Sequence, residues 1–151
     1  MIKVLFVCHG NICRSPMAEF LFKDLVIKKH LEDKFYIESC ATSSEELGNS
    51  VHYGTKRILN NLGIDCSKKR ARKITQQDFY DFDYIIAMDR YNIKNMQYYS
   101  NNQKVKLLLE YASISRDVKD PWYTGNFDET YDDIMTGINA FLEYLIKEEK
   151  I

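Results

Sequence analysis

Apolar and polar positions alternate along the chain in a way that predicts strands separated by helices. Residues 2–8 are β-branched and apolar on both faces, as in a buried parallel strand, and apolar runs at 35–41, 84–88 and 105–109 predict three more strands. Helical spacing or start and stop signals predict helices at residues 15–30, 51–62, 75–79, 91–98 and 134–146. Polar composition predicts loops at residues 42–50, 65–73 and 113–128.

This order of elements favours an α/β fold with a four-stranded parallel sheet flanked by helices on both faces. No repeat, low-complexity tract or shift in composition divides the sequence, so residues 1–151 are expected to form a single domain. Ligands of such sheets bind beyond the carboxyl ends of the strands, where the strand order reverses. The loop after the first strand, residues 8–15, is expected to lie there.

Composition narrows the possible partners and setting. The 21 Lys and Arg against 22 Asp and Glu give a net charge of -1, so no overall field attracts nucleic acid or a membrane surface, and neither partner is predicted. No apolar run approaches the ~18 residues of a membrane helix. The four Cys have no paired spacing, which favours a reducing cytoplasmic setting in which a special cysteine is more often catalytic than structural.

The loop after the first strand holds a Cys, five intervening residues and an Arg, namely Cys8 and Arg14. Spacing alone is weak evidence, because Cys66 and Arg72 repeat it. Context separates the two pairs. Cys8 ends a strand, and Gly10 permits unusual backbone angles. A helix then opens, with Ser15 expected as its cap and Pro16 as its first residue, and Cys66 has none of these features.

Such a loop can bind a phosphate group. Successive backbone N–H groups point inward and a helix N-terminus adds partial positive charge. Arg14 supplies a planar fork for two phosphate oxygens. The same field favours a thiolate at Cys8, which would be a strong nucleophile placed below the phosphorus atom.

The run VCHGNICRSPMAE, residues 7–19, closely resembles the signature of the low-molecular-weight protein tyrosine phosphatases. The resemblance continues at residues 39–43, 47–49, 83–89 and 120–123, in order and over essentially the whole chain. It implies a phosphocysteine intermediate, no metal or other cofactor, and phosphotyrosine proteins or small aryl phosphates as substrates. Phosphate-like oxyanions are expected to inhibit. The single domain is then a phosphatase domain whose residues 8–15 form its P-loop.

The resemblance also implies roles for individual residues. Cys8 is the nucleophile, Arg14 the phosphate clamp and Asp120 the general acid, while Asn11 holds the loop and Ser15 donates to the thiolate. An acid is needed because ester cleavage leaves an oxygen anion that must be protonated. An ordinary Asp-Pro turn is the alternative for Asp120. The residues expected to bind phosphate or substrate are His9, Gly10, Asn11, Ile12, Cys13, Ser15, Trp122 and Tyr123.

Several residues of the predicted site keep two interpretations. Cys13 could close a reversible disulfide with Cys8, or simply pack in the loop. His9 is expected to point outward rather than to act in catalysis. Two departures from the family pattern stand out: Lys69 where many relatives have His, and Glu45 where many have an aromatic wall of the entrance. A carboxylate at Glu45 should repel acidic substrates.

Two competing functions use the same loop. An oxyanion reductase resembling arsenate reductases needs further redox cysteines later in the chain, and no Cys follows Cys66. A phosphate-binding module without turnover would not need an intact set of Cys8, Arg14 and Asp120. Hydrolysis of an aryl phosphate in metal-free buffer separates the three functions.

Overall fold

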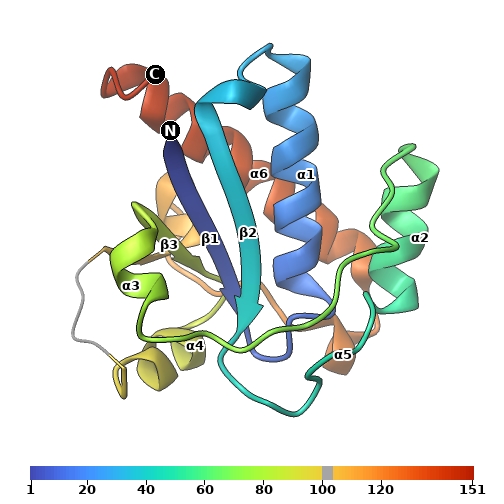
Figure 1. Ribbon diagram of the computed structural model, residues 1–151. Helices are drawn as coiled ribbons and strands as arrows, with labels where there is room; N and C mark the ends of the chain where they lie inside the picture. Colours follow the sequence, from blue (N-terminus) through green and yellow to red (C-terminus); the bar gives the residue numbers. More distant parts are fainter. Residues whose placement is uncertain (100–103) are drawn as a thin grey trace.

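The computed structural model describes residues 1–99 and 104–151. Its sheet contains four parallel strands in the order β2-β1-β3-β4, and this confirms the predicted fold class. The strands are β1 (Ile2–Cys8), β2 (Phe35–Ala41), β3 (Tyr84–Ala87) and β4 (Val105–Leu107). Figure 1 shows β1 and β2 side by side, with their carboxyl ends at the same edge.

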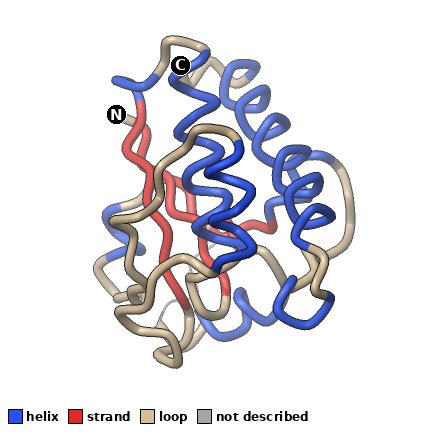
Figure 2. The backbone as a smooth tube through the Cα atoms, turned by 90° about the vertical axis from the view of Figure 1, so that its right-hand side faces the viewer, coloured by secondary structure: helices blue, strands red, loops and turns tan. Residues whose placement is uncertain are grey.

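Six α-helices and two short 3-10 helices connect the strands within the described residues. The α-helices are α1 (Arg14–Lys28), α2 (Tyr53–Asn61), α3 (Asp78–Asp81), α4 (Arg90–Met96), α5 (Pro121–Thr124) and α6 (Phe127–Lys147). The 3-10 helices are η1 (Glu32–Lys34) and η2 (Leu108–Ala112). Figure 2 shows the strands in the interior with helices packed along them. No helix in residues 1–99 or 104–151 is long and apolar enough to cross a membrane.

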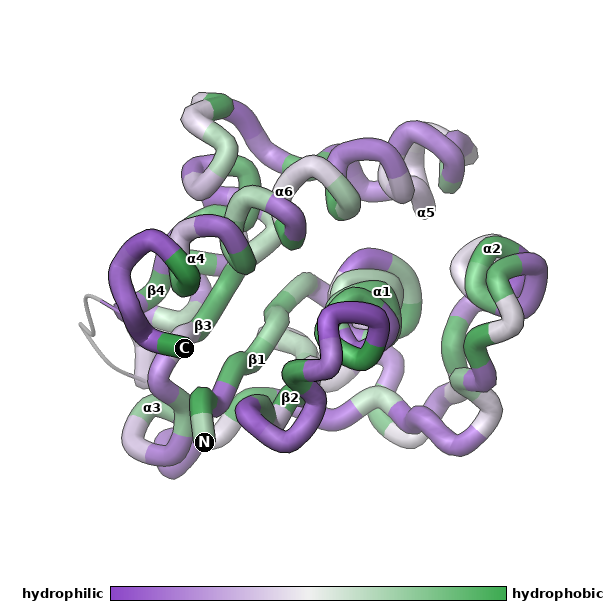
Figure 3. Tube along the Cα trace, turned by 90° about the horizontal axis from the view of Figure 1, so that it is seen from above, coloured by the Kyte–Doolittle hydropathy of each residue, from purple (hydrophilic) through white to green (hydrophobic). Residues whose placement is uncertain are grey.

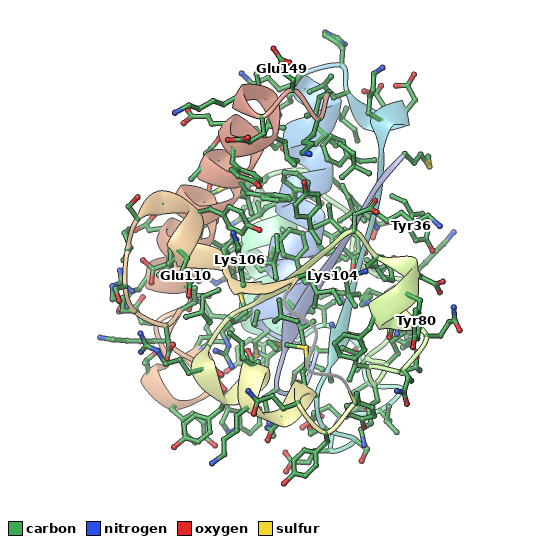
Figure 4. All side chains as sticks on the ribbon, turned by 90° about the vertical axis from the view of Figure 1, so that its left-hand side faces the viewer. Tyr36, Tyr80, Lys104, Lys106, Glu110 and Glu149 are labelled. Atoms are coloured by element: carbon green, nitrogen blue, oxygen red, sulfur yellow. The ribbon has the colours of Figure 1, made fainter. Side chains whose placement is uncertain are left out.

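The apolar residues of β1 serve two separate cores. Val4 and Phe6 pack with α1 and α6 on one face of the sheet, whereas Leu5 and Val7 pack with residues of α3 and α4 on the other. This is why residues 4–8 of the strand are continuously apolar rather than alternating, while Lys3 near its start is exposed. Figure 3 shows apolar segments of β1 between α1 and α3. Figure 4 labels Tyr36 and Tyr80, which lie exposed near α3, away from the carboxyl edge of the sheet.

The start of the first helix was predicted wrongly. Helix α1 begins at Arg14, its N-cap is Cys13, and no side chain caps it. Ser15 is therefore the second residue of the helix and Pro16 the third. Pro16 still lies in the first turn, where its missing N–H has no helical partner. The Ser15 hydroxyl lies 3.0 Å from the Cys8 sulfur instead of bonding to the helix backbone.

The predicted loop 113–128 is also wrong in part, because it contains α5 and the start of α6. Asp120 caps α5 by accepting a bond from the Trp122 N–H at 3.0 Å, and Pro121 occupies the first helical position. Asn126 caps α6 in the same way, accepting from the Glu129 N–H. Capping residues are polar, so two adjacent helix starts have the composition of a loop.

Other differences concern element ends. Residues 108–112 form η2 rather than extending the fourth strand, and the third strand ends at Ala87. Helix α2 begins at Tyr53 because His52 is its N-cap, accepting from the Gly54 N–H through Nδ1. The helix predicted at 75–79 lies at Asp78–Asp81, and the one predicted at 91–98 lies at Arg90–Met96.

Candidate active site

Loop 8–15 follows the carboxyl end of β1, whose neighbours β2 and β3 lie on either side of it. The strand order reverses at this point, as expected for a ligand site. A cavity of about 140 Å³ opens above the loop. It is lined by Cys8, His9, Gly10, Ile12, Cys13, Arg14, Glu45, Glu46, Asp120, Trp122 and Tyr123.

The peptide groups of loop 8–15 are held in one orientation. Four of its carbonyls accept hydrogen bonds from groups outside the loop: Cys8 from Thr42 N (3.0 Å), His9 from Ser43 N (3.0 Å), Ile12 from His52 N (2.8 Å) and Cys13 from Thr55 Oγ1 (2.9 Å). Within the described residues, the N–H groups of Gly10, Ile12 and Cys13 have no protein acceptor. With the carbonyls bound on the outside, the loop keeps N–H groups available for an anion.

Asn11 supplies the unusual backbone angle that had been expected of Gly10. Its φ is 59°, in the left-handed region that Asn tolerates better than most residues. Its side chain Nδ2 donates to Ser15 Oγ (2.8 Å) and Ser39 Oγ (2.9 Å), and its Oδ1 accepts from the Arg72 N–H (3.2 Å). Gly10 does not have a positive φ, and a Cβ there would lie 3.3 Å from Glu46 Cγ, a contact that a small shift of the Glu46 side chain would relieve.

The Cys8 sulfur is buried among hydrogen-bond donors. It is approached by the Asn11 N–H (3.3 Å), the Ser15 N–H (3.4 Å) and the Ser15 hydroxyl (3.0 Å). Asn11 Nδ2 donates to that hydroxyl oxygen, so the hydroxyl proton is directed either at the Cys8 sulfur or at the Cys40 carbonyl, which lies 3.4 Å away. The loop thus places three hydrogen-bond donors around this one sulfur atom.

Burial holds the other three cysteines in the thiol form. Burial raises the pKa of Cys13, Cys40 and Cys66 above the ordinary value of a thiol. The negative charges of Cys8 and Asp120 raise the pKa of Cys13 further. These groups stay protonated at neutral pH, and all four cysteines are reduced in the structure.

The second Cys–Arg pair of the sequence forms no comparable loop. Arg72 makes a two-point contact with Asp78, at 3.0 and 3.1 Å, and a longer ion pair with Glu38. Its guanidinium therefore joins segments around α3, and only its backbone N–H reaches Asn11.

Arg14 lies at the base of the cavity with 2% of its side chain exposed. Nη1 donates to Asp89 Oδ2 (2.7 Å) and to the Val118 carbonyl (2.9 Å), while Nη2 lies 3.5 Å from Asp120 Oδ2. Burial alone would lower the pKa of Arg14, but the negative charges of Cys8, Asp89 and Asp120 raise it overall. The guanidinium is thus a fixed cation aimed at the loop.

Asp120 and its neighbours form one wall of the cavity. Asp120 is held by its own helix cap and by Arg14, and it is partly exposed. Trp122 is 59% and Tyr123 85% exposed, so both offer aromatic surface at the entrance. The structure thus brings Asp120, Trp122 and Tyr123 together with loop 8–15, over 100 residues away in sequence.

Another part of the cavity lining carries the two carboxylates Glu45 and Glu46. The His9 ring donates through Nε2 to Glu45 Oε2 at 2.9 Å, and both side chains lie at the surface. His9 therefore lines the rim with its ring turned toward Glu45 rather than toward the Cys8 sulfur.

Sequence reasoning missed Glu46 as a wall residue and Asp89 as a partner of Arg14. Asp89 could have been found as the polar residue that follows the third predicted strand at the same sheet edge.

A buried polar network supports Asn11 from below. Ser39 Oγ accepts from Asn11 and donates to Glu19 Oε1 at 2.5 Å. Lys69 Nζ lies 3.3 Å from that same oxygen and donates to the Ser39 carbonyl at 2.8 Å, while Lys23 binds the other oxygen of Glu19 at 2.6 Å. Lys69 thus occupies the place where a His was expected from the family, and it contributes a full positive charge.

No group of three or more His, Cys, Asp or Glu in the described part of the chain has a geometry that could hold a metal ion. The polar groups of the cavity are backbone N–H groups, a guanidinium and carboxylates. Such a set can bind an oxyanion, present a sulfur nucleophile to it and exchange a proton with it.

Comparisons with known proteins agree with this geometry. A model of the low molecular weight phosphotyrosine protein phosphatases matches residues 3–151. The chain is 47% identical to the low molecular weight protein-tyrosine-phosphatase YfkJ of Bacillus subtilis, covering all of both chains, and 37% identical to PtpA of Staphylococcus aureus, covering 98% of that protein. The crystal structure of YfkJ superimposes with a TM-score of 0.93 over 98% of this chain and 96% of its own.

A second solved structure, the low molecular weight protein tyrosine phosphatase SP-PTP of Streptococcus pyogenes, is 45% identical, with a TM-score of 0.85 over 96% of this chain and 93% of its own. The class is therefore that of the protein-tyrosine phosphatases, hydrolases that act on phosphotyrosine. Within that class, the chain belongs to the low molecular weight phosphotyrosine protein phosphatase family.

Proposed function

We propose that the chain hydrolyses phosphotyrosine through a phosphocysteine intermediate formed on Cys8. The observation that carries the proposal is one cavity that contains the Cys8 sulfur, the unpaired amides of the loop, Arg14 and Asp120. In the first step the Cys8 thiolate attacks phosphorus, an S–P bond forms, and the P–O bond to the tyrosine oxygen breaks. Asp120 gives its proton to that oxygen, so tyrosine leaves neutral.

The second step reverses the role of Asp120. A water molecule attacks the phosphorus of phosphocysteine, Asp120 takes one of its protons, and the S–P bond breaks to release inorganic phosphate. Throughout both steps the loop amides and Arg14 hold the phosphate oxygens. The Ser15 hydroxyl, 3.0 Å from the sulfur, stabilises the thiolate that leaves. Trp122 and Tyr123 flank the aromatic ring of the substrate at the entrance.

The broader expectations belong to the same proposal. Residues 1–151 act as a single phosphatase domain in the cytoplasm, on phosphotyrosine proteins or small aryl phosphates, without a metal or other cofactor. His9, Gly10, Asn11, Ile12 and Cys13 shape the phosphate site, and oxyanions of tetrahedral or trigonal-bipyramidal shape inhibit. Cys13 also keeps its proposed second role, a reversible disulfide with Cys8.

The test is hydrolysis of an aryl phosphate in metal-free buffer by three proteins: the parent chain, Cys8→Ser and Cys66→Ser. Cys66 is a matched control because it is an equally buried thiol outside the cavity. The proposal expects Cys8→Ser to lose turnover while still binding phosphate-like anions, and Cys66→Ser to remain close to the parent. Turnover by Cys8→Ser within tenfold of the parent would refute the mechanism.

A further inference from the structure

A second cavity adjoins the first one and shares a wall with it. Its volume is about 360 Å³, and it lies between the start of α2 and the segment that joins α5 to α6. In Figure 1 this region is at the lower right, where α5 lies near the lower end of α2. Trp122 lines both cavities. The other lining residues are His52, Tyr53, Gly54, Arg57, Pro121, Gly125 and Phe127.

Aromatic rings form the walls of this second cavity. The His52 ring stacks on Tyr53 and on Phe127, with centroids 4.4 and 5.0 Å apart, and meets Trp122 edge to face at 5.7 Å. Gly54 is required by this packing, since a Cβ there would lie 2.6 Å from the Phe127 ring. The shape of the second cavity is thus set by close contacts among these rings and Gly54.

The side chains that line the cavity offer hydrogen-bond donors. His52 Nδ1 accepts from the Gly54 N–H, so the neutral ring carries its proton on Nε2. Burial lowers the pKa of His52, against a smaller opposing effect of Glu46, and this keeps the ring neutral at pH 7. Within the described residues, Nε2 has no acceptor.

Arg57 is the charged group of the cavity. The Arg57 side chain is 55% exposed and forms a loose ion pair with Asp128, with 3.6 Å between Nη2 and Oδ1. The Asp128 side chain is itself 78% exposed. Exposed pairs of this kind are worth about 0.2–1 kcal/mol, so another carboxylate can replace Asp128. The contact with Asp128 shows that a carboxylate can pair with the Arg57 guanidinium at the edge of the second cavity.

We propose that the second cavity binds the carboxylate side chain of an Asp or Glu that flanks the phosphotyrosine of a protein substrate. This inference rests on the proposed function, because it needs the phosphate to sit over Cys8. Because Trp122 lines both cavities, they adjoin each other, and one extended peptide can contact both. The lining of the Cys8 cavity itself includes Glu45 and Glu46, whose negative charges disfavour an acidic residue beside them. In the second cavity, the Arg57 guanidinium supplies the positive charge that an acidic side chain needs.

The test uses sets of three phosphotyrosine peptides, which carry Glu, Gln or Phe at one position and are otherwise identical. One set is made for each of the three positions before and the three positions after the phosphotyrosine. The readout is the ratio of kcat/KM for the Glu peptide to that for the Gln peptide, in which any uniform change of activity cancels. At one or two neighbouring positions the parent is expected to prefer Glu about two- to fivefold, and this preference should fall at high salt.

Two variants change that ratio in opposite directions. Arg57→Gln should bring it close to one, and Asp128→Asn should raise it because the intramolecular competitor is gone. Arg90→Gln is the matched control: Arg90 is 62% exposed, pairs loosely with Asp117 at 3.8 Å and lines neither cavity. It should leave the ratio at the parent value.

A ratio that Arg57→Gln and Asp128→Asn leave unchanged overturns the proposal. So does a higher rate for the Phe peptide that persists in Arg57→Gln, since the cavity would then take an aromatic side chain. Failure of this inference is distinct from failure of the proposed function. If only this inference fails, the parent still hydrolyses a small aryl phosphate in a Cys8-dependent way. If the proposed function fails, the parent does not.

Discussion

Replacing Lys69 with Met would remove a buried positive charge while keeping the length of the side chain. Lys69 is 12% exposed and Glu19 only 4%, and their charged atoms lie 3.3 Å apart. Removing one partner of a buried pair typically costs about 3–5 kcal/mol, because the other charge stays buried. Lys23, at 2.6 Å, still neutralises Glu19, but its own side chain is 41% exposed. We therefore expect the lower end, about 3 kcal/mol.

Thermal unfolding followed by circular dichroism measures this cost. A loss of about 3 kcal/mol corresponds to a fall in Tm of roughly 6–12 °C, taking ~2–4 °C per kcal/mol for a chain of this size. Lys68→Met is the control, since Lys68 is the exposed neighbour and makes no comparable contact with the network. The double variant Glu19→Gln/Lys69→Met should lose less than the sum of the two single variants, because neither charge is then left alone.

A Tm of Lys69→Met within 2 °C of the parent would refute the reasoning, as would strict additivity in the double variant. The activity readout is independent of the stability readout. Ser39 connects Lys69 and Glu19 to Asn11, so kcat should fall at temperatures where the variant is fully folded. Lys69→Arg keeps the charge and should recover part of both losses.

Three further predictions concern the site and its surroundings. Asp120→Asn should lower turnover by roughly 10²–10⁴-fold for leaving groups that need a proton and by less for p-nitrophenolate; a penalty equal across substituted phenyl phosphates would show that Asp120 only shapes the loop. Vanadate should inhibit and exhaustive chelation should leave the rate unchanged; activity lost on chelation and restored by a divalent metal would contradict the metal-free mechanism. Gly54→Ala should destabilise the fold by about 1–3 kcal/mol in urea unfolding, because its Cβ would overlap the Phe127 ring; a loss below 0.5 kcal/mol would show that the ring can move aside.

The parallel sheet was predictable because each strand carries its own local signal. Residues 2–8 are apolar on both faces, and the structure shows why: the strand feeds one core with Val4 and Phe6 and another with Leu5 and Val7. The placing of loop 8–15 at the carboxyl edge followed from the same pattern. The starts of α1 and α5 did not, because the Ser or Asp before a Pro has the same local composition in different places: Ser15 lies inside the first turn of α1, whereas Asp120 caps α5.

The members of the candidate site were predictable where the chemistry itself demands a residue type, as with a sulfur nucleophile, a guanidinium and a carboxylic acid. The residues that hold them were not. Thr55 binds the Cys13 carbonyl across 42 residues, and Asp89 and Val118 hold Arg14 from 75 and 104 residues away. Such contacts depend on the packing of the whole fold and leave no local pattern in the sequence. Gly10 is an instance: its local signal suggested backbone freedom, but the residue of the loop with a left-handed backbone is Asn11.

The outward bonding of the carbonyls in loop 8–15 has a consequence for specificity. Four peptide groups are fixed by hydrogen bonds from outside the loop, so the cradle holds its N–H groups in place without a ligand. A rigid receptor of this kind recognises a tetrahedral dianion and nothing of the molecule that carries it. Discrimination between substrates is left to the exposed side chains of the two walls, such as Glu45 and Trp122. Evolution can therefore retarget the enzyme by changing its walls without disturbing the chemistry at its base.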